Sequence, residues 1–137
     1  MWIQNVSKRA IANGHHIEPG PNAMLIQIAD PATFFPKPKY PFKEVYQFEF
    51  LDLEEGQDPE AEEFMITDAQ AAELVRLLNH AKDNRMNVIV HCHAGVCRSG
   101  AVCEIGVMLG FEDCETYRQP NVTVKTKMMR ALGWGYY

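Results

Sequence analysis

The sequence predicts an α/β domain in which helices flank a central, mainly parallel sheet. Short apolar runs rich in β-branched residues alternate along the chain with segments of helical periodicity, an order typical of parallel sheets. One run, NVIV at 87–90, is apolar throughout, as expected for a strand that is covered on both faces. The 137 residues are enough for one buried core, so we expect a single domain over residues 1–137.

The first part of the chain contains three expected strands and one short helical turn. The strands are the runs MWIQNV (1–6), AMLIQIAD (23–30) and EVYQFEFLDL (44–53). The segment SKRAIANG, after the first strand, is expected to be helical and to end at Gly14, because glycine is common directly after a helix. Stretches rich in proline and glycine separate these segments and predict irregular connections.

The second part of the chain is expected to be mainly helical. TDAQAAELVRLLNHAKDN (67–84) is the clearest helix, since Thr67 and Gln70 fit a capping box. Its apolar face consists of Ala71, Leu74, Leu77, Leu78 and Ala81. After the strand at 87–90 we expect a buried helix in RSGAVCEIGVMLG (98–110), a short helical piece in CETYRQ (114–119) and a last helix in NVTVKTKMMRALG, capped by Asn121.

Composition and charge exclude several classes of protein. The net charge of −5 gives no general attraction to nucleic acid or to anionic membranes. No apolar run approaches the roughly 20 residues that a membrane-spanning helix needs. The N-terminal stretch lacks the apolar centre of a signal peptide. We therefore expect a cytoplasmic protein without nucleic-acid or membrane partners.

The four cysteines, Cys92, Cys97, Cys103 and Cys114, all fall within 92–114. A disulfide framework normally ties distant parts of a small secreted chain, so this clustering favours reduced thiols. Cys103 is expected in the core. Cys97 either packs beneath its loop or forms a protective disulfide with Cys92 under oxidation.

Two further segments stand out by composition. DLEEGQDPEAEE (52–63) carries seven carboxylates in twelve positions, and such runs are usually solvated loops. Four aromatic residues lie toward the C-terminus, and we expect them to pack against the domain: Tyr117, Trp134, Tyr136 and Tyr137.

The run VIVHCHAGVCRSGAV (88–102) lies at a strand–loop–helix corner, where open α/β folds bind ligands. Backbone N–H groups of such a loop, with the helix N-terminus, form a positive nest that suits an oxyanion and favours a thiolate. Gly95 permits a backbone conformation that a side chain would block. Arg98 can bind two oxygens of a phosphate at once. These residues predict an activated sulfur nucleophile facing a phosphate.

HCHAGVCRS (91–99) resembles the H-C-x-x-G-x-x-R-S active-site signature of cysteine-dependent protein tyrosine phosphatases. The short chain looks most like their compact dual-specificity branch. FEFLDLEE (48–55) resembles the strand that leads to the acid loop of this family, and RQPN (118–121) the segment before its last helix. The resemblance covers roughly residues 23–133, and it implies a protein tyrosine phosphatase-like (dual-specificity) fold.

The resemblance also implies a role for each matching residue. Cys92 attacks phosphorus and forms a phosphocysteine intermediate, while Ser99 donates a hydrogen bond toward the Cys92 sulfur. His91 orients the loop from behind, and Asn121 braces it. The phosphoryl oxygens are bound by the Arg98 side chain and by the backbone N–H groups of the phosphate-binding loop: His93, Ala94, Gly95, Val96, Cys97 and Arg98.

An upstream aspartate acts as general acid in this family. Asp52 lies at the end of the strand run at 44–53 and has the expected position, but it lies 40 residues before Cys92. Asp58 lies 34 residues before Cys92, closer to the spacing of many compact relatives. We favour Asp52, because the end of a strand fixes geometry, and keep Asp58 as the alternative.

The expected substrate is a phosphorylated protein that carries phosphotyrosine, with phosphoserine and phosphothreonine as further substrates. Alternatives are a phosphatase for RNA 5′ ends or inositol lipids, a rhodanese-like sulfurtransferase and a catalytically inactive phospho-binding module. The first of these usually adds lysines within the loop, and none is present here. A metal site at His91, Cys92, His93 and Cys97 is disfavoured, because the adjacent residues 91–93 point in different directions and no second ligand pair has zinc-like spacing. We expect a monomer without metal or organic cofactor.

Overall fold

The structure is a computed structural model and describes residues 1–134. Within these residues, five strands form one sheet in the order β3-β2-β4-β1-β5, and every neighbouring pair is parallel. The strands are β1 (Trp2–Ser7), β2 (Ala23–Ala29), β3 (Glu44–Glu49), β4 (Asn87–Cys92) and β5 (Glu112–Asp113). The expected parallel sheet is confirmed.

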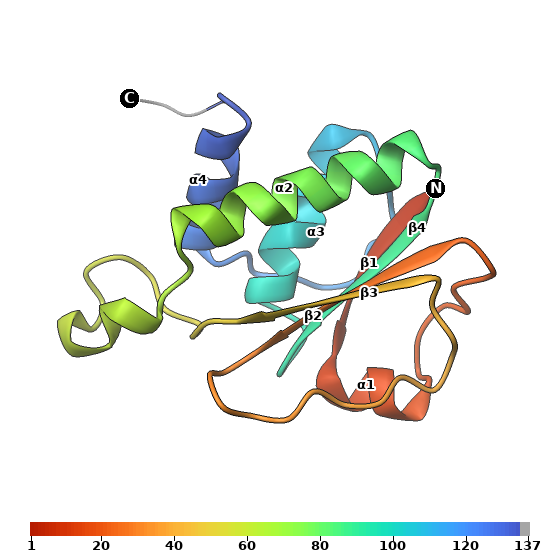
Figure 1. Cartoon of the computed structure of the whole chain (residues 1–137), viewed down its shortest axis with the longest axis horizontal. Helices are drawn as coiled ribbons and strands as arrows, with labels where there is room; N and C mark the ends of the chain where they lie inside the picture. The colour runs from red at the N-terminus through yellow and green to blue at the C-terminus, as the bar shows by residue number, and fades with distance from the viewer. Residues whose placement is uncertain (135–137) are drawn as a thin grey trace.

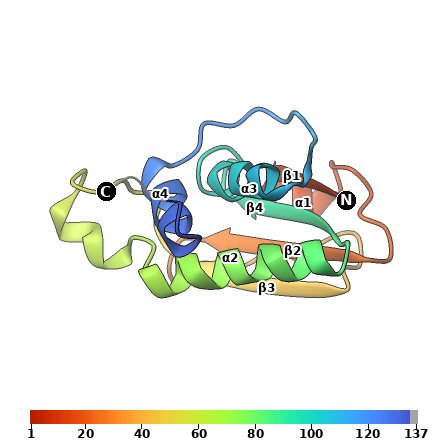
Figure 2. The ribbon, with the colours of Figure 1, turned by 90° about the horizontal axis from the view of Figure 1, so that it is seen from above.

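Helices cover both faces of this sheet, as Figures 1 and 2 show: α2, α3 and α4 lie over one face, and α1 lies on the other. Their bounds are α1 (Lys8–Asn13), α2 (Asp68–Asp83), α3 (Arg98–Leu109) and α4 (Val122–Ala131). The expected flanking helices are therefore confirmed. No helix among residues 1–134 is both long and apolar enough to span a membrane.

The central strand β4 sends alternate side chains to the two faces. Val88, Val90 and Cys92 belong to the larger core beneath α2, α3 and α4, whereas Ile89 belongs to the smaller core beside α1. This follows from the two-residue period of a strand. Because β4 lies between β2 and β1, its carboxyl end, with Cys92, is flanked by both halves of the sheet.

The caps that the sequence predicts are present. Thr67 and Gln70 form the capping box of α2, with Thr67 Oγ1 accepting from Gln70 N at 3.0 Å and Gln70 Oε1 accepting from Thr67 N at 2.9 Å. Asn121 caps α4, because its Oδ1 accepts from Val124 N at 3.0 Å. Each cap satisfies backbone donors that the first turn of a helix leaves free.

The prediction of a short helix at 114–119 is wrong. The segment is irregular, with Glu115 in a left-handed conformation: the Tyr117 carbonyl accepts from Asn5 Nδ2, and Gln119 N donates to the Val96 carbonyl at 3.1 Å. Its backbone groups therefore bind neighbouring segments instead of one another. Pro120 also disfavours helical backbone at the preceding residue.

The acidic segment 52–63 is largely exposed, as expected, but its end forms a 3-10 helix, Pro59–Phe64. The expected packing of the C-terminal aromatic residues is wrong for Tyr117 and Trp134, which are 66% and 40% exposed. Tyr136 and Tyr137 lie outside the described residues.

Candidate active site

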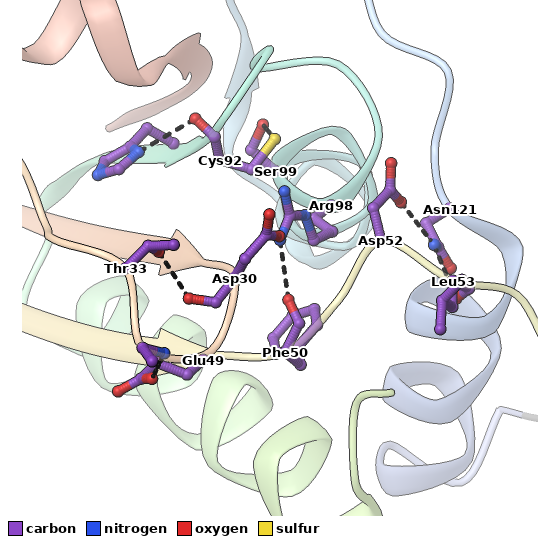
Figure 3. Close-up of polar contacts among 12 residues, drawn as sticks. Asp30, Thr33, Glu49, Phe50, Asp52, Leu53, Cys92, Arg98, Ser99 and Asn121 are labelled. Carbon is purple, nitrogen blue, oxygen red and sulfur yellow. Dashed lines mark hydrogen bonds and ion pairs between the residues drawn. The ribbon is translucent and has the colours of Figure 1, made fainter. Parts of the chain in front are cut away.

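The loop between β4 and α3 folds around the Cys92 sulfur. Cys92 is only 3% exposed, and its Sγ accepts a hydrogen bond from Gly95 N at 3.3 Å. Ser99 Oγ lies 3.1 Å from the same sulfur (Figure 3). When Cys92 is a thiolate, Gly95 N and Ser99 Oγ both donate to its sulfur, and this arrangement stabilises the negative charge.

Strand β1 supports this loop from behind. Gly95 has a φ of +76°, and a Cβ atom there would lie 2.3 Å from the Val6 carbonyl carbon, so only glycine fits. Asn5 is fully buried, and its Nδ2 donates to the Gly95 carbonyl at 2.7 Å and to the Tyr117 carbonyl at 3.0 Å. Asn5 was not identified from the sequence; the two adjacent amides, Gln4 and Asn5, in an otherwise largely apolar strand were the available signal.

His91 lies on the opposite side of β4 from Cys92. It is fully buried, and its Nδ1–H donates to the Cys92 carbonyl at 3.2 Å. Burial lowers the pKa of His91 to about 4, and the charges of Lys8 and Arg98 act in the same direction. The imidazole is therefore neutral at neutral pH and forms part of the packed support of the loop.

Arg98 opens α3 and is 4% exposed. Its Nη1 donates to Asp30 Oδ1 at 2.7 Å and to the Phe50 carbonyl at 2.8 Å (Figure 3). Its Nε is buried and has no hydrogen-bond partner among the described residues. Asp30 was not identified from the sequence, although it follows an apolar strand as Asp52 does.

Asp52 follows β3 and is held by Asn121 (Figure 3). Asn121 Nδ2 donates to Asp52 Oδ1 at 2.8 Å and to the Leu53 carbonyl at 3.0 Å. Asn121 N donates to the Cys97 carbonyl at 3.0 Å. One residue therefore connects the segment of Asp52, the phosphate-binding loop and the start of α4.

Asp58 has a different position. Its Oδ1 accepts from Glu60 N at 3.2 Å, so it caps the 3-10 helix Pro59–Phe64. It is exposed and lies outside the lining of the pocket that contains Cys92. Capping this helix gives Asp58 a local structural role.

The predicted residues meet in an open pocket of about 350 Å³. It is lined by Asp30, Leu51, Asp52, Leu53, Cys92, His93, Ala94, Cys97 and Arg98. Gly95, Ser99 and Asn121 support it as described above, and Val96 binds the 114–119 segment through its carbonyl. A larger recess of about 420 Å³ lies at the other end of β2 and β3, lined mainly by proline and aromatic side chains, without cysteine or arginine.

Cys97 forms part of the pocket wall and does not pack beneath the loop. Burial raises the pKa of Cys97, and the charge of Asp52 adds to this effect. Cys103 lies in the core, as expected, and burial raises its pKa to about 12. All four cysteines are free thiols.

Comparisons with known proteins agree with this geometry. The family model described as "Protein-tyrosine phosphatase" matches residues 36–133, and a search of curated proteins gave no match. Human DUSP28, a solved structure, is 15% identical, with a TM-score of 0.57 over 98% of this chain and 81% of its own. OH1 from the Orf virus, described as a tyrosine phosphatase with triple substrate specificity, is 21% identical, with a TM-score of 0.49 over 79% of this chain and 56% of its own.

At 15% identity, the likeness to human DUSP28 establishes the fold alone. The family match adds sequence evidence over most of the chain, and its range includes the loop between β4 and α3. The chain therefore belongs to the cysteine-dependent protein-tyrosine phosphatase family and has the fold of its compact, dual-specificity-like members.

Proposed function

We propose that this protein hydrolyses phosphotyrosine in proteins, with phosphoserine and phosphothreonine as further substrates, through a phosphocysteine at Cys92. The observation that carries the proposal is the meeting of Cys92, Arg98 and Asp52 in one pocket, although they come from β4, α3 and the segment after β3. Membership of the protein-tyrosine phosphatase family supports phosphatase activity. No metal or organic cofactor takes part in the proposed reaction.

The phosphoryl group is bound by the loop at the N-terminus of α3. Backbone N–H groups of residues 93–98 and the Arg98 guanidinium donate to its oxygens, and the helix N-terminus adds a positive potential. Arg98 Nε supports this role, because it is a buried donor without a partner among the described residues. These donors also stabilise the charge that the three equatorial oxygens carry in the transition state.

Catalysis proceeds in two displacements. In the first, the Cys92 thiolate forms the S–P bond as the bond from phosphorus to the leaving oxygen breaks, and Asp52 protonates that oxygen. In the second, Asp52 accepts a proton from water as the water oxygen attacks phosphorus, and the S–P bond breaks. The Ser99 hydroxyl, 3.1 Å from the sulfur, then stabilises the departing thiolate.

The walls of the pocket support an aromatic substrate. Leu51 and Leu53 contribute apolar side chains on either side of Asp52. Cys92 is almost completely buried, so a long, flat side chain such as phosphotyrosine reaches it best. Leu51 and Leu53 are half-buried and line an open pocket, which supports phosphoserine and phosphothreonine as further substrates.

The first test is hydrolysis of para-nitrophenyl phosphate by the wild type and by Cys92→Ser, in EDTA, with and without vanadate. Activity that survives the chelator, disappears in Cys92→Ser and is inhibited by vanadate supports the thiolate mechanism. Phosphate binding without turnover by the wild type would contradict the proposal and favour a phospho-binding module. Loss of wild-type activity in EDTA would contradict the metal-independent mechanism.

A second test compares Asp52→Asn with Asp58→Asn. If Asp52 is the general acid, Asp52→Asn slows hydrolysis of phenyl phosphate much more than that of para-nitrophenyl phosphate, because the poorer leaving group depends more on protonation. Asp58→Asn is the matched control, since it changes the same group on the same segment outside the pocket. The reverse result would assign the acid to Asp58.

A further inference from the structure

A second recess adjoins the pocket that contains Cys92. It has a volume of about 280 Å³, and Asp52 and Cys97 line both cavities. These two residues therefore form the boundary between the cavities. When a protein substrate has its phosphotyrosine in the first pocket, the neighbouring residues of the substrate chain lie at the mouth of that pocket. One of their side chains can then enter the second recess.

The lining of this recess is polar and carries negative charge. It combines two carboxylates, Asp52 and Glu54, with the amides of Gln57, Gln119 and Asn121. Within the part of the chain that the structure describes, this lining includes no lysine, arginine or histidine. A cavity of this composition favours a cation with several N–H donors, which is the chemistry of an arginine or lysine side chain.

Glu54 is held in place with one carboxylate oxygen available. Its Oε1 accepts from Val122 N, at the start of α4, at 3.3 Å, and its backbone N–H donates to Gln57 Oε1 at 3.0 Å. The next residue is anchored to the same helix, because Glu55 N donates to Thr123 Oγ1 at 2.8 Å. Glu54 Oε2 forms no hydrogen bond with another described residue, so it is the oxygen that a bound cation would contact.

Asp52 is less suited to bind a cation directly. Its Oδ1 accepts from Asn121 Nδ2 at 2.8 Å (Figure 3), and its carboxyl group is the proposed general acid. A positive group in contact with it would favour the ionised form and oppose protonation of the leaving oxygen. Glu54 is therefore the main acceptor, and Asp52 adds electrostatic attraction from the boundary of the recess.

Basic side chains of the chain itself leave Glu54 unpaired within residues 1–134. Lys127 and Arg130 line a different recess, which Glu54 and Glu55 also line, but neither forms an ion pair with Glu54. Lys127 Nζ pairs instead with Asp68 Oδ1 at 3.4 Å. A basic group from the substrate would therefore supply a charge that Glu54 does not receive from its own chain.

We propose that the recess beside Asp52 is a substrate subsite: it binds an arginine or lysine side chain close to the phosphotyrosine, and Glu54 selects that side chain. The inference rests on the proposed phosphatase function and names the class of protein on which it acts. The same charge disfavours an acidic side chain at this position of the substrate, because like charges repel. The preferred substrates are then phosphotyrosine proteins with a basic residue near the phosphorylated one.

The test measures kcat/KM for phosphotyrosine peptides of equal length that differ at one position. Arginine, lysine, glutamine or glutamate is placed in turn at each of the two positions before and after phosphotyrosine. At one of these positions, the wild type should prefer the basic peptides over the glutamine peptide by about three- to tenfold, and the glutamine peptide over the glutamate peptide. Equal values for all peptides would overturn the inference, while their hydrolysis would still support the proposed function.

Two matched variants separate the recess from the acidic segment as a whole. Glu54→Gln removes the charge and keeps an oxygen for Val122 N, and its preference for the basic peptides should fall to within about twofold. Glu55→Gln makes the same change of charge at the next residue, outside this recess, and should keep the wild-type preference. Each preference is a ratio, so an effect of the variant on catalysis in general cancels. Equal losses in both variants would indicate general attraction by the acidic segment and overturn the subsite.

Charge reversal gives a second measurement. Glu54→Lys should reverse the order, so that the glutamate peptide is hydrolysed better than the arginine peptide. Thermal unfolding shows whether each variant folds, and an unchanged preference in a folded Glu54 variant would refute the role of Glu54. A wild type that hydrolyses neither para-nitrophenyl phosphate nor any of the peptides would overturn the proposed function, and this inference with it.

Discussion

Replacing Gly95 by Ala should damage both the fold and the site. The new Cβ would lie 2.3 Å from the Val6 carbonyl carbon and 2.4 Å from Ser7 N, about 1 Å closer than ordinary contact. Both neighbours are backbone atoms of β1, so neither can rotate away. The left-handed φ of +76° adds about 1–2 kcal/mol, and overpacking about 1–3 kcal/mol, so unfolding should become easier by about 2–5 kcal/mol.

Gly20→Ala is the matched control. Gly20 has a φ of +80° but nothing within 4 Å of a Cβ, so this variant measures the conformational cost alone. Denaturant unfolding gives the free energy of each variant, and hydrolysis of para-nitrophenyl phosphate reports the site. Gly95→Ala should also lose turnover, because moving the loop disrupts the hydrogen bond from residue 95 N to the Cys92 sulfur. Equal destabilisation by the two substitutions, or wild-type turnover in Gly95→Ala, would refute this reasoning.

Three further predictions concern buried groups. Asn5→Ala removes two hydrogen bonds to backbone carbonyls and should lower the free energy of unfolding by about 1–3 kcal/mol. The control in denaturant unfolding is Asn22→Ala, which removes two similar bonds at the surface. Equal losses of stability in the two variants would contradict this prediction. Burial lowers the pKa of His91 to about 4 in the folded protein. Between about pH 6.5 and 4, His91 therefore binds a proton in the unfolded chain but not in the folded one, and the free energy of unfolding should fall by about 3 kcal/mol over this range. Denaturant unfolding across this range should show that His91→Gln loses that pH dependence, and an unchanged slope would refute the assignment. Burial raises the pKa of Cys103 to about 12, so its thiol should not react with iodoacetamide at about pH 8 until the protein unfolds. Mass spectrometry of the labelled protein checks this, and labelling of Cys103 in the native protein would count against its burial.

The sequence was most informative where contacts are local. The loop from Cys92 to Arg98 could be predicted because its nucleophile, glycine and arginine are neighbours in the chain, and the preceding apolar strand indicates its place in the sheet. The caps at Thr67 and Asn121 were predictable for the same reason, since each depends on residues within one helical turn. The physical rules for strands, turns and caps act over a few residues.

Contacts between distant segments could not be predicted in this way. Asn5 binds the carbonyl of a residue 90 positions later, and Asp30 binds Arg98 across 68 positions. Neither residue belongs to a motif, and only the packing of β1 and β2 beside β4 brings them to the loop. Spacing alone also left Asp52 and Asp58 as alternatives, whereas the structure places one in the pocket and the other at a helix cap.

The strand order has a consequence for how the protein folds. β1 pairs only with β4 and β5 among the described strands, and both follow it by more than 70 residues. β2 and β3 are close in sequence and can pair early, but β1 has no place until β4 inserts between it and β2. Long-range closure of this kind is a slow step in folding. Because β4 ends in Cys92, the step that joins the two halves of the sheet also completes the pocket, so recovery of activity during refolding would report the closing of the sheet.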